Sequence, residues 1–297
     1  AAAPINCFRN RFLKHPRDVR SRSGGGRLFQ HFEARFMLIG RHGLCLRSAD
    51  RLTLHLMATV SPITQATPKL LQVVNRLLIP KRISFTGNSN SRAATHRIKL
   101  YKFFQEMDFH TIAFDYRGYG DSTNVYPSEA GVVEDALLIY DWLISTVDKG
   151  GELPNVYVWG HSLGTGIASH LLGNLDELSK DILEKTTPLP LPKGLILEAP
   201  FNNLVDEIYE HPMSKLVLWL HWYETSFIRP FVSSFRSDEY LQRVPQLPVL
   251  ILHAEDDRIV PFVVGNQVSH SSYIFFKYQS KSHKWICNAD DLPNVVR

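Results

Sequence analysis

Residues 155–167 read NVYVWGHSLGTGI, and this stretch decides the fold class of the chain. The apolar run over residues 155–159 predicts a strand, and we expect a helix from Ile167 onward. A glycine-rich turn joins them, and its first five residues fit the Gly-x-Ser-x-Gly nucleophile elbow: Gly160, His161, Ser162, Leu163 and Gly164. The glycines keep side chains from colliding across such a sharp turn, and the strand-to-helix context argues against an ordinary Ser/Gly turn.

Strand and helix patterns alternate from about residue 80 onward. Apolar runs predict further strands over residues 79–85, 110–116, 194–197, 249–253 and 274–278. Helical spacing predicts helices over residues 95–107 and 128–146, and Ser128 is a good N-cap for the second. Unbroken apolar strands that alternate with helices indicate a mostly parallel sheet with helices on both faces. The predicted fold class is therefore α/β, in the form of the α/β-hydrolase fold.

The chain divides into two unequal parts. We expect residues 1–65 to be a poorly defined basic segment with a strand pair near residues 36–57, and residues 66–297 to form the hydrolase domain. Residues 1–50 carry ten Lys or Arg against three acidic residues, so they hold a charge of +7 within a chain of net charge +4. Such a segment contacts anionic lipid headgroups or nucleic acid, or is a solvated leader, which is the interpretation that we favour. Peripheral contact with a membrane surface stays open as the alternative, and we expect no nucleic acid.

Few features point to a compartment. Three well-separated cysteines, Cys7, Cys45 and Cys287, indicate free thiols in a reducing compartment, so we expect an intracellular protein. No apolar run approaches the roughly 18–20 residues that span a bilayer, and the first residues do not resemble a secretory signal. Because the chain begins with Ala1 and not with Met, we expect that an upstream segment precedes it.

A serine nucleophile needs a base, and the base needs an orienting acid. The strand over residues 249–253 runs into an acidic turn, in which Asp257 is our candidate acid and Asp256 the alternative. His283 follows the last predicted strand and is our candidate base. The competing histidines are expected to be structural because of where they lie: His161 inside the elbow, His253 at a strand end and His270 before a strand.

The negative charge that forms on attack needs two backbone N–H donors. Leu163 directly follows the nucleophile and supplies one, and Asn88, in the loop after the strand over residues 79–85, is expected to supply the other. The competing His42-Gly43 pair lies too far upstream. The segment around Asp115 lacks the lysine of a nucleotide-binding loop, and no residues have metal-ligand spacing, so we expect no cofactor and no metal.

Residues 202–243 interrupt the alternation and are expected to form a helical cap insertion above the sheet. The insertion is rich in aromatic residues: Tyr209, Trp219, Trp222, Tyr223, Phe227, Phe231 and Phe235. An aromatic cap beside a serine nucleophile suits an acyl chain. Cap helices that simply pack on the sheet explain the pattern nearly as well.

Several longer stretches resemble the α/β-hydrolase domain-containing protein 12 group, which contains monoacylglycerol and lysophosphatidylserine lipases. They cover much of residues 80–290 and are Thr95 to Tyr101, Phe114 to Ser122, Trp159 to Gly166, Leu197 to Phe201 and Leu250 to Pro261. The resemblance implies triad roles for Ser162, Asp257 and His283, and a location at the endoplasmic reticulum membrane. The chain has Thr86-Gly87-Asn88 where the group has His-Gly-Asn, and it is shorter before His283.

The predicted function is a serine esterase that cleaves a lipid ester, such as a monoacylglycerol or a lysophospholipid, through an acyl-enzyme. An acyl-protein thioesterase would use the same three residues, and assays of a lysolipid beside a palmitoylated peptide would separate the two. A catalytically inactive scaffold or binding protein with this fold is the alternative of a different class. The changed residue Thr86 and the shorter approach to His283 are the features that favour it. The sequence does not determine the oligomeric state.

Overall fold

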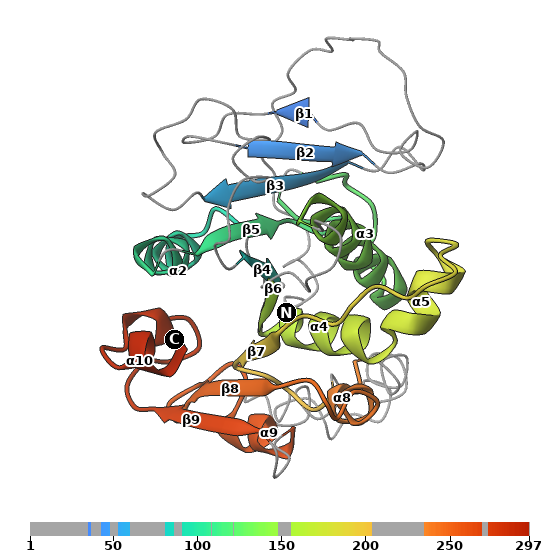
Figure 1. Ribbon diagram of the computed structural model, residues 1–297. Coiled ribbons are helices and arrows are strands. Elements are labelled where there is room, and N and C mark those ends of the chain that lie inside the picture. Colours follow the sequence, from blue (N-terminus) through green and yellow to red (C-terminus); the bar gives the residue numbers. More distant parts are fainter. Residues whose placement is uncertain are drawn as a thin grey trace, which may run out of the picture.

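The computed structural model describes residues 35–36, 43–47, 53–59, 81–85, 91–107, 109–120, 122–147, 156–203, 235–268 and 273–296. The strands within these ranges form one nine-stranded sheet in the order β1-β2-β3-β5-β4-β6-β7-β8-β9 (Figure 1). The first three are β1 (Arg35–Phe36), β2 (Gly43–Arg47) and β3 (Thr53–Thr59), and their pairing is antiparallel. The strand pair predicted near residues 36–57 is therefore present as β2 and β3.

The remaining strands run parallel to one another. They are β4 (Lys81–Phe85), β5 (His110–Phe114), β6 (Val156–His161), β7 (Gly194–Glu198), β8 (Val249–Ala254) and β9 (Ile274–Tyr278). The predicted α/β fold class with a mostly parallel sheet is confirmed. Because β3 pairs with β5, the sheet continues across the division that we predict at residue 65; the two-part domain division otherwise stays a prediction.

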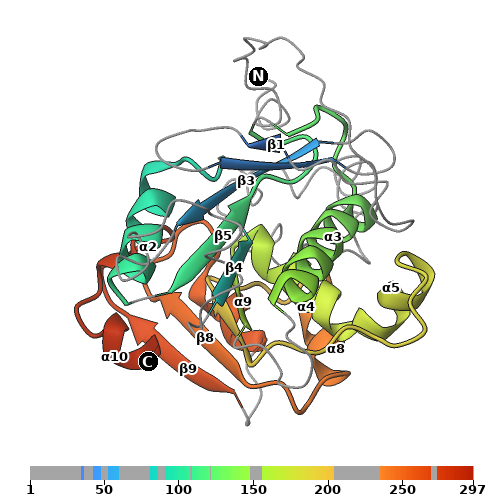
Figure 2. The same cartoon turned by 45° about the horizontal axis from the view of Figure 1, so that its top comes forward.

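Helices cover both faces of the sheet. On one face lie α3 (Glu129–Val147), α4 (Leu163–Gly173) and α8 (Ser237–Gln242), followed outward by α5 (Leu175–Asp181) (Figures 1 and 2). On the other face lie α2 (Thr95–Glu106) and α10 (Leu292–Val296), with a short 3-10 helix, η7 (Ile286–Asn288), between sheet and helices. A further described helix, α9 (Phe262–Gln267), follows β8. None of the described helices is long and apolar enough to cross a membrane.

The predicted helices are confirmed, with one correction. We expected the helix after the elbow from Ile167, but α4 begins at Leu163. The prediction was wrong because the glycine-rich segment was assigned to the turn, whereas Gly164 and Gly166 lie inside the helix. A Cβ on Gly166 would come within 3.0 Å of Phe201 and Phe235, so the absence of a side chain lets α4 pack closely there.

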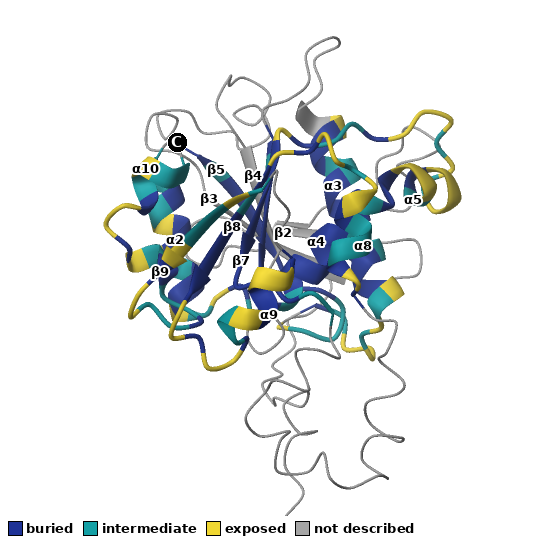
Figure 3. Ribbon diagram, turned by 90° about the horizontal axis from the view of Figure 1, so that it is seen from below, coloured by how far each residue is buried: buried dark blue, intermediate teal, exposed yellow. Residues whose placement is uncertain are grey.

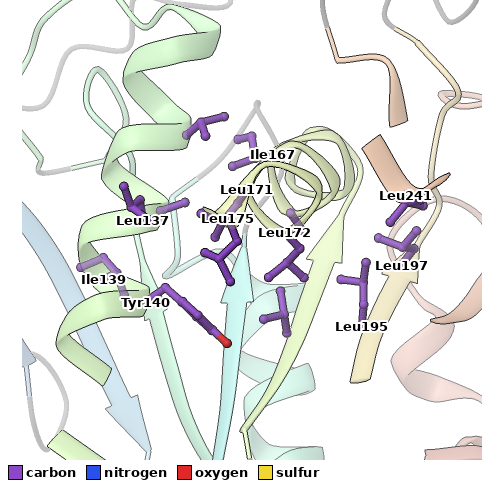
Figure 4. Close-up of a cluster of buried hydrophobic side chains, with 14 of the residues drawn as sticks. Leu137, Ile139, Tyr140, Ile167, Leu171, Leu172, Leu175, Leu195, Leu197 and Leu241 are labelled. Carbon is purple, nitrogen blue, oxygen red and sulfur yellow. The ribbon is translucent and has the colours of Figure 1, made fainter. Parts of the chain in front are cut away.

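The larger hydrophobic core lies between the sheet and the layer formed by α3, α4 and α8 (Figure 4). Leu137 and Tyr140 of α3 face Ile167 and Leu171 of α4 across this core, and all four are fully buried. Burial is deepest in the central strands and on the inner sides of these helices, whereas α5 carries exposed residues (Figure 3). The second core lies under α2 and α10 and is built around Phe104 and Trp159.

The predicted cap insertion is described only at its two ends. Residues 204–234, which hold six of the seven aromatic residues predicted to line an acyl site, lie outside the described residues. The seventh, Phe235, is 5% exposed and packs edge-on against Phe201, so it belongs to the core. Residues 237–242 form α8, which packs against α4 on the face of the sheet.

Leu171 offers a direct test of the core between α3 and α4. Its side chain is 0% exposed, so Leu171→Ala removes buried apolar atoms and leaves a cavity. We expect the free energy of unfolding to fall by about 2–5 kcal/mol, measured by urea denaturation. Lys180→Ala, at an exposed position on α5, is the control and should change the free energy of unfolding by less than about 0.5 kcal/mol. Equal effects of the two substitutions would contradict this packing.

Candidate active site

Three parallel strands carry the predicted catalytic residues to one edge of the sheet. Ser162 directly follows β6, Asp257 lies in the turn after β8, and His283 lies in the loop after β9. Because the carboxyl ends of parallel strands share an edge, residues far apart in sequence converge there. All three are buried, with exposed fractions of 8%, 6% and 6% respectively.

Ser162 occupies a backbone conformation that side chains rarely adopt, with φ 53° and ψ −123°. Its N–H donates to the carbonyl of Glu198 at 2.9 Å, and its own carbonyl accepts from the N–H and the hydroxyl of Thr165 at 2.8 and 2.6 Å. A Cβ at Gly160 would lie 2.6 Å from the carbonyl oxygen of Gly164. The turn therefore requires glycine at position 160, as the elbow motif predicts.

Asp257 and His283 form a buried pair. Nδ1 of His283 lies 2.8 Å from Oδ2 of Asp257, and the other carboxylate oxygen accepts the N–H groups of Ile259 and Val260 at 2.8 and 2.9 Å. A carboxylate only accepts hydrogen bonds when ionised, so Nδ1 of His283 carries the proton and Nε2 of the neutral ring is left with a lone pair. This is the arrangement that a general base needs.

Asp257 stays ionised in this setting. Burial acts to raise its pKa, but the contacts with His253 and His283 and the N–H of Ile259 outweigh burial and hold the pKa below its usual range. His253 lies farther away, with Nε2 at 3.5 Å from the carboxylate and 3.0 Å from the carbonyl of Val260, to which it donates. His253 is therefore a structural residue of the turn.

The structure separates the two candidate acids. Oδ1 of Asp256 accepts the N–H groups of Lys281 and Ser282 at 3.1 and 2.9 Å, so Asp256 binds the backbone of the loop before His283. The imidazole of His283 bonds to Asp257 instead. The loop approaches with positive φ at Ser280 and Ser282, of 54° and 48°. Although this approach is short, it is long enough for His283 to reach the acid.

Leu163 and Asn88 are the two residues predicted to donate backbone N–H groups to the oxyanion. Leu163 is the first residue of α4, where backbone N–H groups have no partner within the helix. Asn88, predicted as the second oxyanion donor, lies outside the described residues, and so does His270.

His161 is buried beside His283, with ring centroids 4.8 Å apart. This contact brings the residue next to Ser162 against the candidate base.

The segment around Asp115 is a scaffold that connects several elements. The Asp115 carboxylate accepts the backbone N–H of Arg92 at 2.6 Å and pairs with its guanidinium. The adjacent Arg117 bonds to Asp135 of α3 through its backbone N–H and its side chain. These contacts tie the turn after β5 to the start of α2 and to α3. Among the residues that the structure describes, no group of His, Cys, Asp or Glu could hold a metal ion.

The sequence analysis missed a set of polar groups buried beneath the elbow. Arg97 and Glu198 are each 3% exposed, and Glu198 accepts a hydrogen bond from Nε1 of Trp159 at 2.9 Å. Hydrophobic periodicity identifies only apolar residues as buried. It therefore did not predict that Arg97 lies on the buried face of α2. Both residues lie in stretches that carry the family resemblance, and that was the available signal.

The fold is that of an α/β-hydrolase, and comparison with known proteins agrees with this class. The chain belongs to the Alpha/beta hydrolase family, whose sequence model matches residues 92–276. Two solved structures show the same fold: Est1E from Butyrivibrio proteoclasticus, with a TM-score of 0.60 and 14% identity over 89% of this chain and 95% of that one, and an alpha-beta hydrolase from Vibrio vulnificus, with 0.59 and 17% over 86% and 79%.

Curated relatives show which α/β-hydrolases the chain resembles in sequence. The chain is similar to Lysophosphatidylserine lipase ABHD12 of Rattus norvegicus, with 38% identity over 227 residues, which are 71% of this chain and 53% of the relative. It is also similar to Protein ABHD12B of Homo sapiens, with 37% identity over 71% of this chain and 58% of that protein. The resemblance to this group is thereby confirmed. The chain spans about half the length of the curated relatives it matches.

Glu198 makes the stability of this site depend on pH. Burial raises its pKa to about 7, against about 4.3 in an unfolded chain. Between these values the folded state binds more protons than the unfolded state, so the free energy of unfolding falls as the pH rises through that window. Glu198→Gln removes this effect. Relative to the parent, the variant should gain about 3 kcal/mol between pH 4 and pH 8 in urea denaturation.

Glu177→Gln, at an exposed position on α5, is the matched control and should show no such gain. If the difference between Glu198→Gln and the parent were the same at both ends of the pH range, Glu198 would be ionised to the same extent in the folded and unfolded chains. The raised pKa that we ascribe to the burial of Glu198 would then be wrong.

Proposed function

We propose that this chain is a serine hydrolase that cleaves the acyl ester of a lysophospholipid, with lysophosphatidylserine as the first candidate and monoacylglycerol as the second. The observation that carries the proposal is the buried hydrogen bond of 2.8 Å between His283 and Asp257 at the edge of the sheet where the elbow holds Ser162. The substrate class is supported by the relatives, of which those named Lysophosphatidylserine lipase ABHD12 are 36–38% identical to the chain.

In the proposed reaction, Oγ of Ser162 attacks the ester carbonyl while Nε2 of His283 takes the hydroxyl proton. The imidazolium that forms is stabilised by the Asp257 carboxylate, which already bonds to Nδ1. The N–H of Leu163 and the N–H of Asn88 hold the negative charge on the former carbonyl oxygen. His283 then gives its proton to the leaving glycerol oxygen, and the acyl chain remains on Ser162.

Deacylation repeats these steps with water in place of the serine hydroxyl. His283 takes a proton from the water, which attacks the acyl-enzyme carbonyl, and then returns a proton to Oγ of Ser162 as the free fatty acid leaves. Asp257 must stay ionised in both halves of the cycle, and its lowered pKa supports that requirement. A lipid ester presented in a membrane requires peripheral contact between the chain and that membrane, which we include in the proposal.

Two substitutions test the proposal by release of fatty acid from lysophosphatidylserine. Ser162→Ala should lower kcat by at least about 10³-fold, since only binding and the oxyanion donors would remain. Asp257→Asn should lower it by about 10⁴-fold, because the amide favours the wrong imidazole tautomer. Glu255→Gln, an exposed carboxylate of the same turn, is the control and should keep the parent rate.

Retained turnover in a folded Ser162→Ala variant would reject the assignment of the nucleophile. The same assay should include a monoacylglycerol and a palmitoylated peptide. Cleavage of the thioester alone would reject the proposed substrate class while leaving the three catalytic residues in place.

A further inference from the structure

Both ring nitrogens of His161 are engaged, although this residue has no step in the proposed reaction. Nη2 of Arg97 lies 3.0 Å from Nδ1 of His161, and Nε2 of His161 lies 2.8 Å from the carbonyl oxygen of His283. His161 and Arg97 are each 3% exposed. The contacts join α2, the last residue of β6 and the loop after β9, which are remote in sequence.

The partners determine where the His161 proton lies. A guanidinium has only donors, so Nδ1 of His161 must accept and carries no proton. A carbonyl oxygen only accepts, so Nε2 carries the proton and donates it to His283. Only the neutral ring fits both contacts. Burial and the charge of Arg97 hold the pKa of His161 well below its usual value, which agrees with a neutral ring that takes no part in proton transfer.

His283 is thereby held at its backbone as well as at its side chain. Asp257 binds the imidazole, and His161 binds the carbonyl of the same residue. The loop before it is held by Asp256, through the N–H groups of residues 281 and 282. The imidazole must lie within hydrogen-bond reach of the Ser162 hydroxyl to take its proton, so a shift of the His283 backbone should lower the rate.

We propose that Arg97 and His161 form a positioning pair for the candidate base: Arg97 fixes the tautomer of His161, and His161 fixes the main chain of His283 relative to the elbow. This inference rests on the proposed function, because it assigns His283 as the base. Ser162 directly follows His161, so one residue connects the position of the nucleophile to that of the base. Neither Arg97 nor His161 touches the reacting atoms in this role.

The test compares two substitutions in the full chain, with p-nitrophenyl butyrate as substrate. His161→Phe keeps a ring of similar size but loses both hydrogen bonds, and a displacement of about 1 Å at a catalytic group can cost about 100-fold in rate. We expect kcat to fall by about that factor while KM stays near the parent value. His161→Gln keeps one acceptor and one donor, so its kcat should stay within about tenfold of the parent.

His96→Phe is the matched control. His96 is also buried, and its ring lies 6.1 Å from those of His161 and Trp285, but it makes no bond to the backbone of His283. This control should keep the parent kcat. A folded His161→Phe variant with the parent kcat would overturn the positioning role, and so would equal losses in His161→Phe and His161→Gln.

A measurement on the parent chain guards against variants that do not fold. Nitrogen-15 NMR of the histidine rings should show His161 as the neutral form protonated at Nε2 at pH 7. A ring protonated at Nδ1, or at both nitrogens, would overturn the pair. Loss of all hydrolysis in the parent would instead reject the proposed function, whereas an active parent with an unaffected His161→Phe variant would reject the pair alone.

Discussion

The strained turn at Ser162 is the constraint on which the rest of the site depends. A non-glycine residue with φ 53° and ψ −123° costs about 1–3 kcal/mol and persists only where its surroundings impose it. Here the carbonyl of Glu198 on the neighbouring strand holds the N–H of Ser162, and Thr165 holds its carbonyl twice. Gly160 leaves the space that the backbone of Gly164 occupies. The backbone conformation of Ser162 therefore depends on the positions of two strands and a helix.

Arg97 and Glu198 form a layer of buried polar groups beneath the elbow. Burying Arg97 costs free energy, and burial lowers its pKa, while the charges of Glu198 and Asp115 act in the opposite direction. An apolar layer of the same volume would have cost less, since it would leave no charged group to desolvate. The role of Arg97 in this layer is to orient its neighbours. Its hydrogen bond sets the orientation of His161, and His161 in turn holds the backbone of His283.

Much of this site could be predicted from the sequence because each candidate residue lies at the end of a strand or in the loop that follows it. Apolar runs predicted these strands over residues 155–159, 249–253 and 274–278, and the strands end at residues 161, 254 and 278. Parallel strands bring their carboxyl ends to one edge. The choice between Asp256 and Asp257 was not readable in the same way, since it depends on the path of the loop over residues 280–282. The start of α4 was misplaced because glycines inside a helix resemble a turn. The partners of His161 are 64 and 122 residues away, beyond any local pattern.

The central claim is that Ser162 is an activated nucleophile, and labelling with a fluorophosphonate tests it most directly. The purified chain is incubated with the reagent, digested, and mapped by mass spectrometry, beside a His283→Ala variant of confirmed fold. An activated serine should give one adduct, on the peptide that contains Ser162, and the variant should give none because the hydroxyl loses its base. No adduct in the folded parent chain, or an adduct on a different serine, would contradict the assembly of Ser162, His283 and Asp257 into one catalytic unit.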